Sequence, residues 1–250
     1  MLLSMKKMRL KLLCCEILTR EAEAAAAGSN HQVEIEFLPK KLHDRGQALM
    51  LPELQRALSA QAGKNYDYLL LGYGLCNNGV VGLTAADIPL VIPRAHDCIT
   101  LFLGSRARYT EYFHQNPGVY FLTSGWIDYG QNEQDQLSVQ HRLGLDKSYT
   151  DLVREYGADN AAYIQETLGG LTSNYQQFTY IDMGVEPDDR YEQIARQRAA
   201  DKNWRFQKIP GDLTLMRKLL GGDWPEEEFL TVPPGKKIVQ TYDDRIIASE

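Results

Sequence analysis

The most constraining feature of the chain is the alternation, over its first hundred residues, of short apolar runs with longer segments of helical spacing. Each apolar run is short enough for a buried strand and is bounded by breaks such as glycine or proline. These runs are 9–15, 32–38, 66–73 and 89–93. Helical segments at 16–27 and 51–62 separate the first three runs, with Pro52 placed in the first turn of the second helix. This order predicts a parallel sheet with right-handed crossovers.

The rest of the chain continues the alternation. Helical spacing is found at 101–114, 191–202 and 213–220, and strand-like runs at 119–123, 178–183, 204–209 and 228–232. The pattern predicts a single α/β domain over 1–250, with Rossmann-like parallel sheets and helices on both faces. Two closely packed Rossmann-like halves, 8–124 and 175–250, joined by a helical segment at 125–174, are the alternative division.

Composition excludes several classes of protein. Apolar residues make up 44% and charged residues 24% of the 250 residues, both near the averages of globular proteins. The net charge of −6 argues against an electrostatic nucleic-acid binder. No apolar run approaches the roughly 18 to 20 residues of a membrane span, and basic residues interrupt the apolar N-terminus. We therefore expect a cytoplasmic protein without nucleic-acid or membrane partners, and a homodimer is one option for an acidic protein of this size.

Three of the four cysteines follow strands of the predicted sheet. Cys15 ends the first strand, Cys76 follows the third by three residues, and Cys98 lies five residues beyond the end of the fourth. Because the carboxyl ends of parallel strands meet at one edge, we expect these thiols to lie near one another. Cys14 points to the opposite face of its strand, because side chains alternate along a strand.

Two histidines are predicted at the same edge. His43 lies in the loop after the second strand, and His96 comes two residues before Cys98. Thiolate and imidazole donors suit zinc, or iron held in a cluster. The sequence therefore predicts a metal site made by the three edge cysteines and one of these histidines. The alternative is that the cysteines are small buried apolar residues.

The glycine-rich segment 72–82 (GYGLCNNGVVG) lies among these residues. It has neither the G-x-G-x-x-G register nor a P-loop lysine, which disfavours nucleotide binding. Its Asn77, Asn78 and Gly79 are typical of a tight turn with unusual backbone dihedrals, and such a turn can present backbone N–H groups to a bound cofactor. Nearby, Asp97 either orients a ligating histidine or caps the helix that follows.

These motifs resemble those of a prokaryotic family of uncharacterised proteins, domain of unknown function 1638. The resemblance covers roughly 10–235 and rests on LLCCEILTRE, LPKKLHDRG, YGLCNNGVVGL, HDCITLFLG and YFLTSGW. Recurrent positions of the family match four residues here: Cys15, His43, Cys76 and Cys98. The family pattern has a histidine directly before the third cysteine, whereas this chain has Asp97 there and His96 one residue earlier.

The resemblance also implies a link to one-carbon chemistry, because family members are often encoded near corrinoid-dependent methyltransferases. Zinc-dependent enzymes of that kind use a thiolate- and histidine-bound zinc as a Lewis acid toward a thiol or alcohol. The expected function is a zinc-dependent methyltransferase with a small-molecule substrate and a corrinoid protein or methyltransferase as partner. The alternatives are an iron–sulfur protein, or a non-catalytic protein that carries a metal or corrinoid for a partner enzyme.

Overall fold

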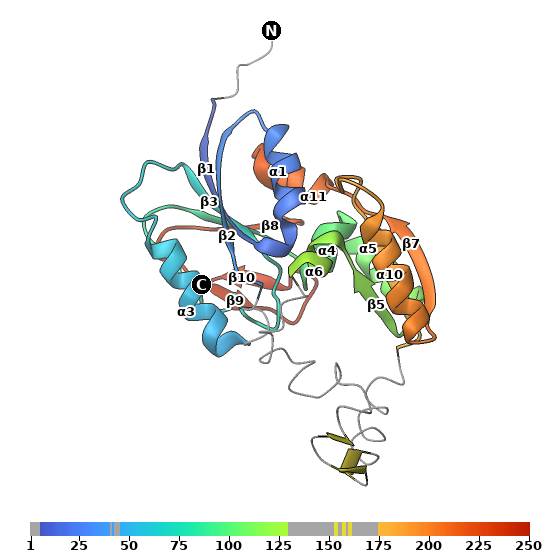
Figure 1. Ribbon diagram of the computed structural model, residues 1–250. Coiled ribbons are helices and arrows are strands. Elements are labelled where there is room, and N and C mark those ends of the chain that lie inside the picture. The colour runs from blue at the N-terminus through green and yellow to red at the C-terminus, as the bar shows by residue number, and fades with distance from the viewer. Residues whose placement is uncertain are drawn as a thin grey trace.

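The computed structural model describes most of the chain, residues 6–40, 42, 46–129, 153–154, 157–158, 160–161 and 175–250. One mostly parallel sheet and one fully parallel sheet, with helices on their faces, give the Rossmann-like α/β architecture that the sequence predicts (Figure 1). None of the described helices combines the length and apolar character that a membrane crossing requires. The predicted helical join at 125–174 lies largely outside the described residues, and His43 lies outside them altogether.

The larger sheet has five strands in the order β2-β1-β3-β4-β8. Their bounds are β1 Arg9–Cys15, β2 Gln32–Leu38, β3 Tyr68–Gly72, β4 Leu90–Pro93 and β8 Phe229–Val232. The first four strands are parallel, and β8 runs antiparallel to β4. Because β2 and β3 flank β1 on opposite sides, the strand order reverses between β1 and β3. Open α/β sheets bind ligands beyond the carboxyl ends of their strands at such a point.

Helices cover both faces of this sheet (Figure 1). They are α1 Thr19–Ala27 and α11 Thr214–Gly221, which pack together, and α3 Gln47–Ser59 on the opposite face. Met50, Leu54 and Leu58 are buried on α3, as their spacing of four residues requires for one helix face. The helix begins four residues earlier than the sequence suggests, so Pro52 lies in its second turn rather than its first.

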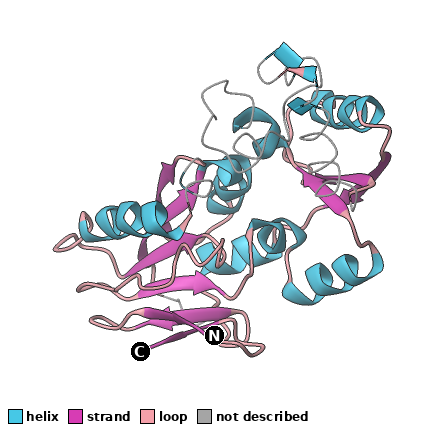
Figure 2. Cartoon of the chain, turned by 90° about the horizontal axis from the view of Figure 1, so that it is seen from below, coloured by secondary structure: helices cyan, strands magenta, loops and turns pink. Residues whose placement is uncertain are grey.

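The smaller sheet is formed by three parallel strands in the order β5-β6-β7, with helices on both sides (Figure 2). The strands are β5 Val119–Leu122, β6 Gln177–Asp182 and β7 Arg205–Pro210, and the helices are α5 Arg106–Gln115 and α10 Arg190–Asp201. Tyr112 of α5 reaches onto the sheet, where its hydroxyl lies 2.8 Å from Thr179 Oγ1 and donates to Gln207 Oε1 at 2.8 Å. This partly buried polar contact links α5 to the sheet.

Two features of the chain path differ from the expectation. The predicted helix at 101–114 is two helices, α4 Cys98–Leu103 and α5, because Gly104 between them adopts a φ of 75° and ends α4. After the smaller sheet the chain returns to the larger one through α11 and β8. It ends in an antiparallel pair, β9 Ile238–Gln240 and β10 Ile247–Ser249, that the sequence pattern did not reveal.

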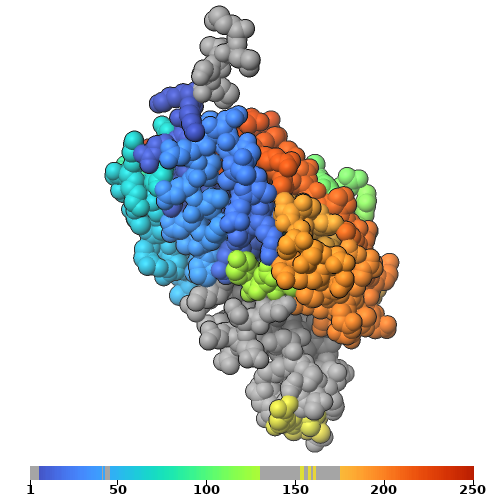
Figure 3. All heavy atoms as spheres, turned by 45° about the horizontal axis from the view of Figure 1, so that its top comes forward, coloured from blue at the N-terminus to red at the C-terminus, as the bar shows by residue number. Residues whose placement is uncertain are grey.

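Helix α6, Ser124–Tyr129, connects the two sheets. It follows β5 and packs against the short 3-10 helix η1, Glu16–Leu18, at the end of β1. Figure 3 shows α6 on the surface between the N-terminal elements and α10. Arg20 of α1 adds a polar link, donating to Asp128 Oδ2 and to the Tyr191 hydroxyl, both at 2.6 Å.

We expect Gly125→Ala to destabilise the protein. A Cβ at position 125 would lie 1.8 Å from the Ile17 carbonyl oxygen, so α6 must move away from η1. Overpacking of this kind costs about 1–3 kcal/mol of unfolding free energy, which thermal denaturation would record as a fall in Tm of several degrees. Gly221→Ala is the matched control, because nothing lies within 4 Å of its added Cβ. Equal Tm values for the two variants would contradict the close approach of α6 to η1.

Glu21 of α1 is a buried acid at the same junction. It is 2% exposed, and its Oε1 has no hydrogen-bond partner among the described residues. Burial raises the pKa of this carboxyl to about 7; Glu186 adds to the rise, whereas a backbone hydrogen bond and Arg20 oppose it. The folded protein therefore holds a proton on Glu21 that the unfolded chain releases near pH 4.5. This bound proton adds to the free energy of unfolding. The contribution is fully present below pH 4.5 and is lost as the pH rises through about 7.

Glu21→Gln should remove this pH dependence, because glutamine stays neutral. At pH 8 the variant should be more stable than the unsubstituted protein by about 2–3 kcal/mol, and the two should converge near pH 4.5. Urea unfolding at the two pH values measures the difference. Glu23→Gln, an exposed position on the same helix, should change little at either pH. The stability gained by Glu21→Gln over the unsubstituted protein should be larger at pH 8 than at pH 4.5. An equal gain at the two pH values would refute the raised pKa of Glu21.

Candidate functional site

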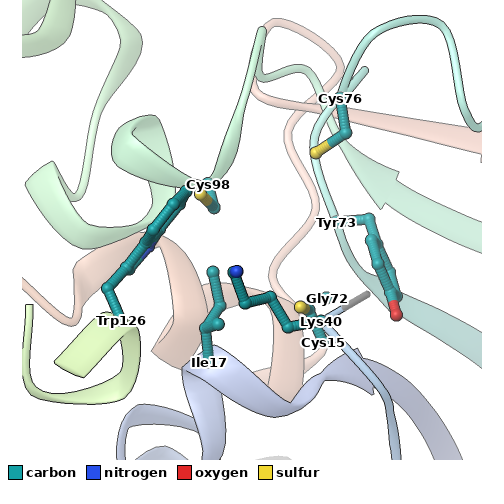
Figure 4. A pocket seen from close by; sticks show the side chains of 8 residues that line it. All are labelled: Cys15, Ile17, Lys40, Gly72, Tyr73, Cys76, Cys98 and Trp126. Atoms are coloured by element: carbon teal, nitrogen blue, oxygen red, sulfur yellow. The ribbon is translucent and has the colours of Figure 1, made fainter. Parts of the chain in front are cut away.

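A small pocket lies beyond the carboxyl ends of β1 and β3, at the point where the strand order reverses. Its lining consists of Cys15, Ile17, Lys40, Gly72, Tyr73, Cys76, Cys98 and Trp126 (Figure 4). The cavity volume is about 20 Å³, which is room for one water-sized species. Both sheets contribute to the pocket, because Trp126 comes from α6 and the other residues from the larger sheet and its loops.

The structure brings together three of the residues that the sequence singled out. Cys15 is the last residue of β1, Cys76 follows β3, and Cys98 is the first residue of α4. The segments after β3 and β4 continue to pair, since Leu75 N donates to Ala95 O at 2.7 Å and Cys76 N to His96 O at 3.0 Å. This pairing places Cys76 opposite the start of α4 and therefore beside Cys98.

Cys14 points away from the pocket, as the alternation of side chains along β1 predicts. It is fully buried, and its Sγ lies 3.8 Å from the Gly72 carbonyl oxygen. Gly72 leaves room for this thiol, because a Cβ there would lie 2.4 Å from Cys14 Sγ. Cys14 is thus a core residue, and Cys15 is the cysteine of this pair that lines the pocket.

The turn after β3 holds Cys76 in a strained backbone conformation. Cys76, Asn77 and Asn78 have φ values of 45°, 54° and 63°, in the left-handed region that asparagine tolerates better than cysteine. Strain at a non-glycine residue concentrates at functional sites, where the surrounding structure imposes it. Gly79 has no such φ; its N–H donates to the Cys76 carbonyl at 3.0 Å, and a Cβ would lie 2.2 Å from Met50 Sδ. Asn77, Asn78 and Gly79 lie outside the pocket lining, and their cofactor-binding role stays a prediction.

His96 has an exposed side chain, and it is not among the residues that line the pocket. Asp97 caps α4, because its Oδ1 accepts from Ile99 N at 3.0 Å and Thr100 N at 3.4 Å. Tyr109 donates to the other Asp97 oxygen at 3.1 Å. Within the described ranges, no three His, Cys, Asp or Glu side chains lie close enough together to bind one ion as they stand.

Lys40 is a charged pocket residue that the sequence did not single out. It is 8% exposed, its Nζ lies 5.8 Å from the centre of the Trp126 ring, and its backbone N–H donates to Glu16 Oε1 at 2.7 Å. In the view of Figure 4 the ammonium points into the space that the three sulfur atoms surround. The available signal was positional: Lys40 comes two residues after β2, at the same sheet edge as the cysteines.

Two further donors of the lining are buried without a partner. The Tyr73 hydroxyl and the Trp126 indole N–H make no hydrogen bond to any described residue. Buried donors in native proteins are satisfied by protein, water or a ligand. Both residues line the pocket, and in Figure 4 the Tyr73 hydroxyl points away from the three sulfur atoms.

Burial suppresses ionisation of the pocket thiols. It raises the pKa of the Cys76 thiol to about 12, to which the neighbouring Cys15 adds, while the backbone N–H groups of Gly74 and Cys98 act in the opposite direction. Burial likewise holds the pKa of the Cys98 thiol well above its usual range, with Cys76 as a second cause. Both thiols are therefore protonated at neutral pH in the metal-free protein, and a cation that binds them must displace the protons.

Cys76 in metal-free folded protein should react with iodoacetamide roughly a thousandfold more slowly at pH 8 than an ordinary thiol, because only the thiolate reacts. The rate should rise about tenfold per pH unit while the fold persists. Mass spectrometry of the tryptic peptide that carries Cys76 gives the rate, and the same protein in denaturant is the control. Comparable rates in folded and denatured protein would contradict the raised pKa of the Cys76 thiol.

No curated protein and no solved structure matched the chain. A family model described as "Protein of unknown function (DUF1638)" matches residues 37–220, which is more than half of the chain. The match runs from the end of β2 to α11 and includes Lys40, Cys76, Cys98 and Trp126. Because the family model covers more than half of the chain, the chain belongs to the DUF1638 family.

Proposed function

We propose that the protein binds one zinc ion through Cys15, Cys76 and Cys98, and that this site serves methyl transfer to or from a small thiol or amine. The observation that carries the proposal is the convergence of three cysteines, from three separate segments, on one water-sized cavity. The cavity lies at the strand-order reversal, where ligand sites of open α/β sheets are expected.

The donor set fits a thiophilic ion. Thiolate sulfur binds zinc and copper(I) and also holds iron–sulfur clusters. A volume of about 20 Å³ favours a single ion over a cluster of several irons and sulfides. In the described structure the three thiols surround the cavity without meeting at one point, so ion binding requires these side chains to turn inward.

Three thiolates leave one position open, which is the arrangement of catalytic rather than structural zinc. When bound there, zinc supplies Lewis acidity that lowers the pKa of a thiol substrate and makes it nucleophilic. The chain's own residues provide the surroundings: Ile17 and Trp126 exclude water, and the Asp97 cap holds the start of α4, where Cys98 lies.

Methyl transfer is the reaction class that we propose, with a corrinoid protein as the methyl donor or acceptor. Activated thiolates are good acceptors of alkyl groups. A metal carrier without turnover would share the binding site. Assays with methylcobalamin and a small thiol distinguish the two, because only an enzyme consumes the methylated cofactor.

Protein purified anaerobically without added metal should contain close to one zinc per chain and be colourless. Cys76→Ser and Cys98→Ser should each lose most of this zinc, because hydroxyl oxygen is a far poorer zinc ligand than thiolate. Cys14→Ser is the matched control: it is adjacent to Cys15 but faces the core, so its zinc content should stay near that of the unsubstituted protein. Elemental mass spectrometry gives the metal content, and circular dichroism checks that each variant is folded.

Other outcomes point elsewhere. Several irons per chain with a broad visible absorbance would replace the zinc proposal by a cluster. Metal-free protein that also fails to take up added zinc would leave the cysteines as buried apolar residues. Equal loss of zinc in Cys14→Ser would refute the assignment of Cys15 as the ligand from β1.

A further inference from the structure

Helix α6 is shared between the two hydrophobic cores of the molecule. Ile127 is buried in the core of the smaller sheet, whereas the neighbouring Trp126 packs against the core of the larger sheet and lines the pocket. In the view of Figure 4, Trp126 and Cys76 lie on opposite sides of the cavity. A helix of only six residues has little stability of its own. The contacts that α6 makes with its surroundings therefore decide whether Trp126 covers the thiols.

Three buried polar atoms at this junction oppose the closed arrangement. Ser124 Oγ and Trp126 Nε1 on α6, and Glu21 Oε1 on α1, have no hydrogen-bond partner among the described residues. Each atom would gain hydrogen bonds to water if the junction opened, so its burial costs free energy. The closed junction therefore needs an interaction that offsets this cost.

A polar cluster that crosses the junction supplies such an interaction. Arg20 Nη2 of α1 donates to Asp128 Oδ2 of α6 and to the Tyr191 hydroxyl of α10, both at 2.6 Å. The same hydroxyl donates to Asp128 Oδ2 at 3.1 Å, and the Arg20 guanidinium lies 4.9 Å from the centre of the Tyr191 ring. The side chains of Arg20 and Asp128 are only 25% and 34% exposed, so water screens their charges less than those of a surface pair. The cluster ties an element of the larger sheet to two elements of the smaller one.

We infer that Arg20, Asp128 and Tyr191 form a latch, which holds α6 closed over the pocket and whose release gives molecules larger than water access to the three sulfurs. Release lets α6 move away from η1, withdraws Trp126 and hydrates the three unpartnered atoms. The pocket thiols are all buried, so a reagent reaches them through local openings of this kind. The inference concerns access to the thiols, and it does not depend on whether they bind a metal.

The test measures iodoacetamide labelling of the metal-free protein at pH 8 in Arg20→Met, Asp128→Ala and the double variant. Each single variant should label Cys76 and Cys98 about 5- to 20-fold faster than the unsubstituted protein, because each removes a charge-assisted hydrogen bond of the latch. The double variant should label these residues no faster than the single variants, because both substitutions remove the same interaction. Asp128→Ala is the cleaner single variant, because Arg20 also lowers the pKa of Glu21.

Cys14 is the control within each protein. It is fully buried on the other face of β1, so global unfolding exposes it but movement of α6 does not. Tandem mass spectrometry resolves Cys14 from the adjacent Cys15, and the labelling rate of Cys14 should stay unchanged in all variants. Arg196→Met is the matched control variant. Arg196 pairs with Glu192 at 2.7 Å, but both residues lie on α10 and their contact does not cross the junction.

The outcomes separate a latch from a general contribution to stability. Unchanged labelling of Cys76 in both single variants overturns the latch. An equal rise at Cys14 and Cys76 also overturns it, because the cluster then stabilises the whole fold rather than α6. A similar rise in Arg196→Met does the same, because any surface ion pair would then have the effect.

The latch and the proposed zinc site can fail separately. Faster labelling of Cys76 in the latch variants of a protein that binds no zinc supports the latch and refutes the metal proposal alone. Zinc binding by the unsubstituted protein, with no change in labelling in the latch variants, refutes the latch alone.

Discussion

The parallel pairing of β1 with both β2 and β3 determines where chemistry can occur in this protein. Parallel strands deliver their carboxyl ends to one edge, so Cys15, Lys40 and Cys76 reach the same edge from three separate segments. Cys98 joins them because β4 is parallel to β3 and because the backbone pairing continues past both strands. No local motif is needed to assemble the pocket; the topology does so.

Enclosure gives the pocket its chemical character. A thiol at a water-exposed edge would ionise near its ordinary pKa, whereas burial raises the pKa of Cys76 to about 12. Such a cavity disfavours isolated thiolates and therefore favours occupants that bring positive charge with them.

The sequence predicted the parts of the fold that depend on local pattern. The apolar run that ends at Cys15 reads directly as a strand, and the alternation of side chains correctly separates Cys14 from Cys15. Pairing between distant segments leaves no local trace. The strand that became β8 was therefore predicted without its antiparallel pairing with β4, and the β9–β10 pair was not foreseen. The break at Gly104 was missed because both sides of it have helical spacing. Lys40 was missed because one lysine in a polar loop resembles any other, and only burial distinguishes it.

The second sheet matters to the site through a single short helix. The lack of a side chain at Gly125 lets α6 approach the Ile17 carbonyl, and this approach brings Trp126 over the cysteines. The pocket is therefore closed by contact between the two sheets rather than by either sheet alone. An ion held by the cysteines of the larger sheet would be covered by Trp126 of α6, which follows the first strand of the smaller sheet. Any movement of α6 relative to η1 would change both the exclusion of water from the sulfurs and the surroundings of the Lys40 ammonium. Stability of the junction and chemistry of the pocket are thus consequences of the same packing contact.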